Sequence, residues 1–409
     1  MKDSKKQKAV YLLGRTRLII AGILLALAID HAKAISSASF TRSDLIQNLQ
    51  TCHTAEDLLE RVGEHLTKQV DPDGSIASPV LVRMGKILMN KDNERREQQL
   101  EMPLLRNRHQ NALLSVVNCL CSINERTDIE SSVEGTKACA SISRIANKEL
   151  SGGVIAAMND FWTVNSDNLL FDSKLEAHHL SGLLWSFETY DYVKSRCAGE
   201  IVLPLNLKRA YDDLKLPFRI LPGLCDHVEE LSVPDLASQV NFRIDSVYTS
   251  SQEIVKERRQ TAWEGDEGVE SFKYSGKSMP RDAFSPTVKR VRDLLDERMD
   301  QYFDCCLLNL YPDGKSAMRY HIDPDQGSLW DFDTVVVSVG ASRRFSFRRN
   351  NAESERPHTF VVMHGDVTHM YGDCQDTFQH AVKKADIKSE QCARASLVFK
   401  RSWGLNQKN

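Results

Sequence analysis

Hydrophobic residues follow two different rhythms along this chain, and the rhythm changes near residue 215. From about 41 to 215, apolar residues recur at spacings of three and four, which is typical of amphipathic helices. Breaker-rich runs at 71–74 and 151–153 separate these segments. The pattern favours an α-helical repeat-like domain over residues 41–215. Its helices are predicted at 45–49, 55–66, 79–89, 111–123, 138–150, 154–162 and 178–192.

Beyond residue 215 the chain reads as short segments in which valine, phenylalanine and tyrosine alternate with polar residues. A period of two indicates β-strands, and one longer amphipathic helix is expected at about 285–302. Many short strands with turns between them favour a double-stranded β-helix, or jelly roll, over residues 225–405. The fold class is therefore α + β multidomain, all-α first and jelly roll second. The strands are predicted at 240–248, 272–274, 305–310, 334–339, 344–347, 360–363 and 395–399.

Residues 1–40 have the pattern of a targeting segment. Lysines and arginines precede an apolar run at 18–29, which is shorter than the roughly 20 residues that span a membrane. Ala32-Lys33-Ala34 then supplies a cleavage pattern, so we expect an ER-type signal peptide and no stable membrane insertion after processing. The sequence Ser-Ala-Ser-Phe at 37–40 also fits a bipartite plastid presequence, and a plastid location is favoured over secretion.

Composition narrows the function classes only slightly. Lysine plus arginine (53) nearly balances aspartate plus glutamate (56), so any nucleic-acid surface must be a local basic patch. The ten cysteines form no CxxC pair. A zinc-finger site is therefore not predicted, and a reducing compartment fits better than a disulfide framework.

One short motif carries candidate metal chemistry. His321 and Asp323 are two residues apart, so on a strand both side chains project from the same face. A second histidine would complete the two-histidine, one-carboxylate triad of non-haem Fe(II) oxygenases. His380, His364 and His369 compete for this position, and spacing alone does not choose between them.

A later strand offers groups suited to a dicarboxylate. Arg394, Ser396 and Lys400 share one face of the strand predicted at 395–399. Asn309 and Tyr311 share a face of an earlier strand. A guanidinium pairs with a carboxylate through two parallel hydrogen bonds, which is what binding of 2-oxoglutarate requires.

With these motifs in order, the span from about 240 to 403 resembles the AlkB-type nucleic-acid dioxygenases. The resemblance implies Fe(II) on His321, Asp323 and His380, with 2-oxoglutarate held by Arg394, and O2 as the oxidant. It also implies oxidative removal of N-methyl groups from bases in RNA or single-stranded DNA. The matching stretches are 258–263, 274–276, 309–314, 321–323, 338–348, 365–366, 379–380 and the strand that begins at Arg394.

Two positions depart from the family pattern. Lys400 stands where the family usually has a second arginine, and Ser396 stands where many members have asparagine. Lysine keeps the charge but lacks the planar two-donor fork. Arg401 is expected on the opposite face of the strand, so weaker cosubstrate binding is anticipated.

The same resemblance implies a substrate surface. Phe272 and Tyr274 occupy positions where the family presents aromatic residues to the target base, and Tyr274 is the preferred stacking residue. Arg258 and Arg343 are candidates for phosphate contacts.

The helical half resembles a second family over one segment. Residues 180–187, Leu-Ser-Gly-Leu-Leu-Trp-Ser-Phe, are similar to the signature of octotricopeptide organellar RNA-binding repeats. Two alternatives to the nucleic-acid demethylase remain open. One is a 2-oxoglutarate-dependent protein hydroxylase or demethylase, and the other is a non-catalytic RNA-binding helical-repeat protein.

Overall fold

The fold is seen in a computed structural model of the chain. The targeting segment 1–40 lies outside the described residues, as do the predicted helix at 45–49 and most of those at 55–66, 111–123 and 154–162. No helix in the described part of the chain is both long and apolar enough to cross a membrane. The described ranges are 77–97, 129–146, 175–194, 205–248, 253–274, 276–352, 354–385 and 392–403, with single residues and short groups between 52 and 158.

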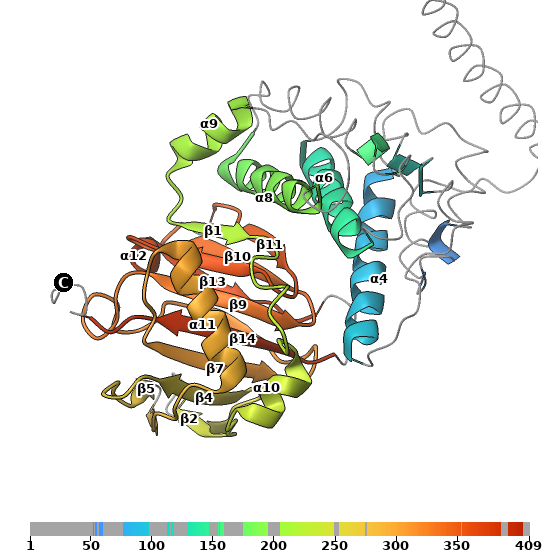
Figure 1. Cartoon of the computed structure of the whole chain (residues 1–409). Helices are drawn as coiled ribbons and strands as arrows, with labels where there is room; N and C mark the ends of the chain where they lie inside the picture. Colours follow the sequence, from blue (N-terminus) through green and yellow to red (C-terminus); the bar gives the residue numbers. More distant parts are fainter. Residues whose placement is uncertain are drawn as a thin grey trace, which may run out of the picture.

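The C-terminal half is built on two antiparallel sheets that face each other (Figure 1). This arrangement is consistent with the predicted jelly roll. The six-stranded sheet has the order β1 (Phe218–Leu221), β12 (Val367–Met370), β9 (Thr334–Gly340), β14 (Arg394–Lys400), β7 (Cys305–Tyr311), β4 (Gln260–Gly265). The four-stranded sheet has the order β11 (His358–Val362), β10 (Arg343–Arg349), β13 (Phe378–Val382), β8 (Met318–His321).

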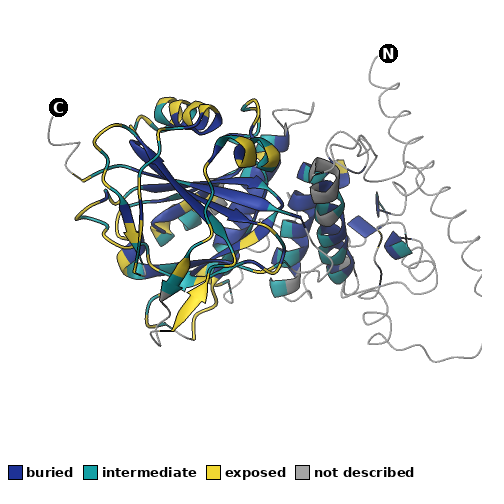
Figure 2. Cartoon of the chain, turned by 90° about the horizontal axis from the view of Figure 1, so that it is seen from below, coloured by how far each residue is buried: buried dark blue, intermediate teal, exposed yellow. Residues whose placement is uncertain are grey.

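Two small hairpins adjoin the sheets: β2 (Ser246–Tyr248) with β3 (Ile254–Lys256), and β5 (Phe272–Tyr274) with β6 (Lys277–Met279). β3 is exposed along its whole length (Figure 2). The strand predicted at 240–248 is shorter than expected, because β2 begins at Ser246 and the preceding residues follow α10 (Val233–Gln239). A single-turn helix, α12 (Cys374–Thr377), precedes β13.

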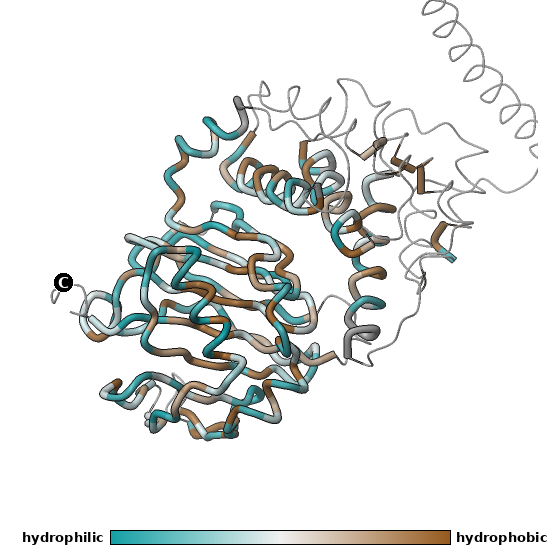
Figure 3. Tube along the Cα trace, viewed as in Figure 1, coloured by the Kyte–Doolittle hydropathy of each residue, from teal (hydrophilic) through white to brown (hydrophobic). Residues whose placement is uncertain are grey.

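The period of two along the central strands separates an outer face from an inner one. Leu308 of β7 and Leu397 of β14 pack outward against Val291 and Leu295 of α11 (Pro286–Met299). Their sequence neighbours point inward toward the facing sheet. Hydrophobic residues run along the central strands and along the helices beside them (Figure 3). The outer face is therefore closed by a helix, and the inner face is left for a site.

Four helices of the N-terminal half pack beside the sandwich: α4 (Ala77–Glu97), α6 (Ile129–Ile145), α8 (Ala177–Lys194) and α9 (Leu205–Leu214). α6 lies between α4 and α8, and α8 packs against β11 (Figure 1). Glu188 of α8 also pairs with Arg219 of β1 at 3.6 Å. Because β1 and β11 are the edge strands of their sheets, α8 covers edges that would otherwise offer unpaired backbone groups.

Helices and sheets share one buried hydrophobic cluster. It contains Trp185 of α8 together with Phe218, Phe347 and Phe360 from the strands. The Phe218 and Phe347 rings stack with centroids 3.8 Å apart. β1 falls in the gap between the two predicted domains and belongs to the six-stranded sheet. In the described residues, the two halves are thus one packed body.

Buried polar contacts tie the two halves together. Arg144 of α6 forms an ion pair with Asp366, which is fully buried in the turn between β11 and β12. Asp366 also accepts hydrogen bonds from the backbone N–H groups of Gly223 (2.8 Å) and Met363 (2.7 Å). A buried carboxylate needs such partners, because desolvation of an unpaired charge is costly. Arg144 of α6 therefore supplies the charge partner of a buried turn of the sandwich.

The segment that resembles an RNA-binding repeat lies mostly in this core. Leu183, Trp185 and Phe187 are buried, and Ser181 contacts His358 of β11. These side chains pack against the sandwich instead of forming an open surface. The helical repeat and its binding of RNA stay predictions. α6 begins at Ile129, earlier than the predicted helix at 138–150, because its first turns carry few large apolar residues.

Acid should weaken the contact between α8 and β11. Burial, together with the charges of His178 and Arg349, lowers the pKa of His358 from 6.5 to about 4. The folded protein therefore resists protonation of His358, and stability is lost as the pH falls from 6.5 towards 4. We expect the free energy of unfolding to drop by about 2–3 kcal/mol over this range from His358 alone. His358→Asn removes the titration and should flatten the dependence, measured by denaturant unfolding at pH 7.5 and 4.5. Equal losses in both proteins would contradict the assignment.

Candidate metal and cosubstrate site

Adjacent strands bring the candidate metal ligands together. β8 and β13 pair in antiparallel register with His321 opposite His380. Asp323 follows two residues after His321, and its backbone N–H donates to Gln375 Oε1 at 2.9 Å. Asp323 Oδ1 lies 3.5 Å from His321 Nε2 and 3.6 Å from His380 Nε2. The three ligand atoms all lie within 4.8 Å of one another, so one ion can contact all three.

The protonation states suit a divalent cation. Burial and the nearby His321 lower the pKa of His380 to about 3, so His380 is neutral at neutral pH. His321 Nδ1 lies 2.9 Å from the Arg319 carbonyl oxygen, where an N–H would leave Nε2 free for the metal. Burial alone would raise the pKa of Asp323, but Lys400, His321 and His380 hold it well below its usual range. The set is two imidazoles and one carboxylate.

The two competing histidines are used elsewhere. His369 belongs to β12 of the six-stranded sheet, and its Nε2 lies 3.6 Å from Asp333 Oδ1. His364 Nδ1 accepts a hydrogen bond from the backbone N–H of Gly340 at 3.3 Å. Neither belongs to the group formed around Asp323.

The candidate dicarboxylate-binding residues gather on three neighbouring strands. Arg394 of β14 is opposite Tyr311 of β7, and Ser396 is opposite both Asn309 of β7 and Ser338 of β9. The Arg394 guanidinium lies 5.2 Å from the Tyr311 ring and donates to Ser338 Oγ at 3.1 Å. Burial lowers the pKa of Arg394 to about 10, which still leaves it charged at neutral pH.

Several donors and acceptors of this group point at no protein partner. Arg394 is fully buried, yet its Nε and Nη1 have no hydrogen-bond partner among the described residues. The same holds for Oδ1 of the buried Asn309. The unpaired N–H donors of this buried guanidinium need acceptors, and carboxylate oxygens are suitable ones. The residues present therefore fit an anionic cosubstrate.

A glycine keeps the strands close at this point. Gly340 ends β9 with φ +81°, a conformation that other residues adopt at a cost. A Cβ there would come within 2.8 Å of the Ala393 carbonyl oxygen. Gly340 thus allows β9 to pair with β14 as far as Arg394.

The position of Lys400 on its strand predicted a contact with the dicarboxylate. In the structure its side chain contacts Asp323 and Thr334. Its Nζ donates to Asp323 Oδ2 at 2.8 Å and to Thr334 Oγ1 at 3.1 Å, and the side chain is fully buried. Arg401 points to the other side, as expected, and pairs with Asp331. The lysine therefore holds the carboxylate of a candidate metal ligand in place.

Above the triad lies a cavity of about 520 Å³. Tyr274 and Phe272 belong to its wall, although Phe272 is almost completely buried against Trp263. The cavity includes the metal ligands as well as Asn309 and Ser396. Its lining residues are Val247, Glu257, Arg259, Phe272, Tyr274, Leu307, Asn309, Tyr311, Met318, Arg319, His321, Ile322, Asp323, Pro324, Val336, Phe345, His380, Val382, Ser396 and Val398.

The basic candidates are placed differently from one another. Arg343 is buried outside the cavity, with its guanidinium on the carbonyl oxygens of Ser342 (2.9 Å) and Cys392 (3.1 Å). Arg258 is exposed and does not line the cavity, whereas its neighbour Arg259 does. Both arginines lie in the bend between β3 and β4, so strand alternation could not have decided which of the two lines the cavity.

Sequence reasoning also missed a charged network on the cavity wall. Glu257 accepts hydrogen bonds from the Tyr274 hydroxyl (3.1 Å) and from Lys277 Nζ (2.6 Å). Arg259 donates to the same hydroxyl at 3.3 Å. Lys277 lies over the Tyr274 ring at 4.6 Å. No motif marks these residues, because they come from separate hairpins.

Comparisons with known proteins agree with this geometry. Residues 226–400 match the 2OG-Fe(II) oxygenase superfamily. The chain is 33% identical over 162 residues to the uncharacterized protein R406 of Acanthamoeba polyphaga mimivirus, covering 39% of this chain and 82% of that protein. The chain belongs to the 2OG-Fe(II) oxygenase superfamily. It is an AlkB-like dioxygenase that uses Fe(II), 2-oxoglutarate and O2.

Characterised relatives share shorter or weaker matches with this oxygenase. Mouse DNA oxidative demethylase ALKBH2 is 28% identical, over 35% of this chain and 61% of that protein. Human alpha-ketoglutarate-dependent dioxygenase alkB homolog 3 is 29% identical, over 56% of this chain and 82% of that protein. A solved structure, that of OsALKBH1, covers 46% of this chain and 98% of its own at 17% identity and a TM-score of 0.34.

Removing the Lys400 charge should loosen the metal. Lys400→Met leaves Asp323 without its ammonium partner, and loss of such an outer partner typically costs 10- to 100-fold in metal affinity. We expect a decrease of about that size in anaerobic Fe(II) or Mn(II) titrations. Arg401→Met, one residue away on the opposite face, is the matched control and should bind metal normally. Similar losses in both variants would rule out a specific role for Lys400.

Removing the Arg394 guanidinium should act on the cosubstrate instead. Arg394→Met is expected to weaken 2-oxoglutarate binding roughly 10- to 100-fold, the usual value of hydrogen bonds to a charged group. Metal affinity should change little, because Arg394 does not contact the triad. Arg394→Lys keeps charge without the fork and should fall between the two. Unchanged cosubstrate affinity in Arg394→Met would place the dicarboxylate elsewhere.

Proposed function

We propose that this oxygenase removes N-methyl groups from nucleobases in RNA or single-stranded DNA. The observation that carries the proposal is a cavity in which Tyr274 and the metal triad line the same space. An extracted base needs an aromatic face for stacking and a reactive centre within reach of its methyl group. Relatives whose names specify DNA oxidative demethylation support the same class of substrate.

Contacts from neighbouring segments hold the Tyr274 side chain in one position. Its hydroxyl lies between Glu257 and Arg259, and the Lys277 ammonium contacts its ring. Lys277 also donates to Asp245 and thereby links two hairpins. A preorganised aromatic wall orients a flat ligand without losing side-chain entropy on binding.

The protein groups have separable tasks in this reaction. His321, Asp323 and His380 would hold the iron, and Arg394 would orient 2-oxoglutarate beside it. When bound, iron and cosubstrate convert one O2 and one 2-oxoglutarate per methyl group into succinate, CO2, formaldehyde and the unmethylated base. The apolar side chains of Phe345, Val336 and Val398 limit water in the same space.

A single-stranded target fits the depth of this site. The cavity extends down to the buried His380, so a base must leave its stack to reach the metal. Arg319, exposed at the rim, offers a charge for phosphate. We further propose that residues 1–40 direct the protein to a plastid, where organellar RNA would be the accessible substrate.

The test uses residues 41–409 as one protein. The helices are kept because they share a core with the sheets. Methylated and unmethylated oligonucleotides, RNA and DNA in parallel, are incubated with Fe(II) and 2-oxoglutarate, and succinate and formaldehyde are measured. We expect methyl-dependent formation of both products. Tyr274→Ala should raise the KM for the oligonucleotide about tenfold or more, since stacking contributes roughly 1–3 kcal/mol per base.

His321→Ala is the inactive control, and Tyr302→Ala, an exposed tyrosine outside the cavity, is the matched aromatic control. The ratio of RNA to DNA turnover would name the polymer. Fe(II) binding without turnover of any oligonucleotide would overturn the proposal and point to a protein substrate.

A further inference from the structure

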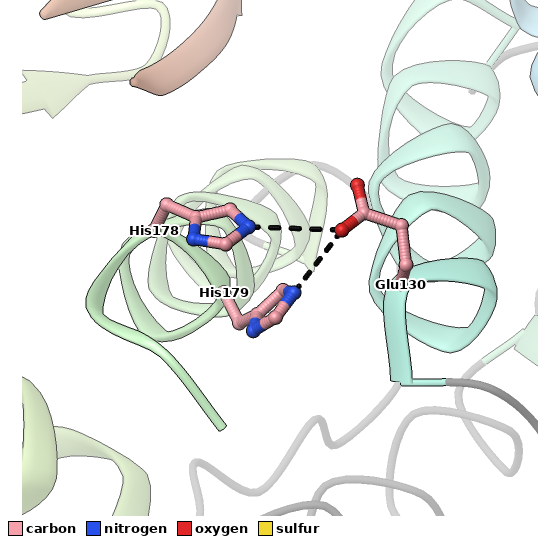
Figure 4. Close-up of side chains that lie close together, drawn as sticks. All are labelled: Glu130, His178 and His179. Carbon is pink, nitrogen blue, oxygen red and sulfur yellow. Dashed lines mark hydrogen bonds and ion pairs between the residues drawn. The ribbon is translucent and has the colours of Figure 1, made fainter. Parts of the chain in front are cut away.

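A second cluster of metal-binding side chains lies in the helical half, away from the oxygenase site. Glu130 stands in the first turn of α6, and His178 and His179 stand in the first turn of α8. Both imidazoles point toward the Glu130 carboxylate (Figure 4). Glu130 Oε2 lies 3.7 Å from His178 Nε2 and 3.2 Å from His179 Nε2. The three ligand atoms lie within 4.8 Å of one another.

These separations match those of a small coordinated ion. Ligands at about 2.0–2.1 Å in a zinc tetrahedron are roughly 3.3 Å apart. The catalytic triad of the same chain shows nearly the same spacing, with 3.5 and 3.6 Å between its carboxylate oxygen and its two imidazoles. In the described residues these are the two groups of three or more such side chains that could hold an ion.

His178 has the hydrogen bonding of a metal ligand. Its Nδ1 lies 3.2 Å from Glu176 Oε2, so a proton there would be held by a carboxylate. Its buried Nε2, on the side of Glu130, has no hydrogen-bond partner within the described part of the chain. A carboxylate that fixes the far nitrogen and leaves the near one free is the usual arrangement around zinc-bound histidine.

His179 and Glu130 each have a competing contact that a metal would replace. His179 Nδ1 accepts from the Glu176 backbone N–H at 3.0 Å, so metal on Nε2 requires the ring proton to move to Nδ1. The Glu176 N–H would then need another acceptor, and Glu176 itself is an exposed residue. Arg356 contacts Glu130 Oε2, but its side chain is 61% exposed and can swing away. In the catalytic triad, by contrast, Lys400 contacts Asp323 Oδ2 and leaves Oδ1 to the two histidines.

We propose that Glu130, His178 and His179 form a zinc site that pins α6 to α8. Neutral imidazoles with one carboxylate suit Zn²⁺. The cluster borders a cavity of about 350 Å³, from which water can fill the fourth position. α6 and α8 also carry Arg144 and Ser181, the residues that contact the sandwich. The ion would therefore stiffen the helical layer where it covers the sheet edges.

The experiment isolates this site from the catalytic one. The full chain without residues 1–40 carries His321→Ala and His380→Ala, is stripped with chelator, and is titrated with Zn²⁺ and with Co²⁺ as a spectroscopic probe. We expect one equivalent to bind with micromolar affinity or better, an intense tetrahedral Co²⁺ spectrum, and a melting temperature that rises with Zn²⁺. Adding Glu130→Gln or His179→Ala should weaken binding at least 100-fold.

His227→Ala is the matched control, because His227 is exposed and pairs with Asp226 instead; it should leave zinc binding unchanged. Circular dichroism of each variant before metal addition shows that it is folded. The proposal is overturned if the double variant binds no zinc, or if Glu130→Gln and His179→Ala bind it as well as their parent. Because the parent protein lacks two catalytic ligands, neither outcome depends on which substrate the oxygenase takes.

Discussion

The register between β8 and β13 is the constraint on which the oxygenase site depends. His321 and His380 are separated by 59 positions in sequence but lie directly opposite each other across this pair. β13 is also paired on its other side, where Phe347 of β10 lies opposite His380. A slip of one residue would turn His380 to the outer face and break the ligand set. Strand pairing therefore positions the two candidate histidine ligands, and Asp323 follows just beyond the end of β8.

The six-stranded sheet supplies the other half of the site through a single strand. β14 lies between β9 and β7, and it carries a buried cation at each end. Arg394 and Lys400 are six residues apart, a span of roughly 20 Å between their Cα atoms in an extended strand. The two cations consequently face different groups: Arg394 lies beside Ser338 and Tyr311, where a dicarboxylate would bind, and Lys400 holds Asp323 beside Thr334. A substitution at one end need not disturb the other.

What could be predicted from sequence follows the range of the interactions involved. The faces of His321 and Asp323, of Arg394 and Ser396, and the turn of Arg401 away from Lys400 depend only on strand alternation. The resemblance to a known family then selected His380 among three histidines. The partner of Lys400, the burial of Arg343 and the network around Tyr274 depend on packing between distant segments. Composition and spacing carry no signal for such contacts.

The helical half shows the same limit more clearly. Periodicity located α4 and α8 to within a few residues, except that α4 continues to Glu97 through charged positions. The same pattern predicts a helical repeat-like domain over 41–215, but it does not show what the helices pack against, because amphipathic helices look alike whether they pack on one another or on a sheet. Only the structure shows Trp185 in a core that includes Phe218 and Phe360.

That shared core affects how the chain folds while the ribosome synthesises it. α8 ends at Lys194, whereas β11, the strand it covers, begins at His358. At a synthesis rate of about 5–20 residues per second, the apolar side of α8 waits roughly 10–30 s for its partner. The contact from Ser181 to His358 spans 177 positions, and contacts of such long range close slowly. The nascent helices therefore need shielding by a chaperone or a provisional packing among themselves until the last strands emerge.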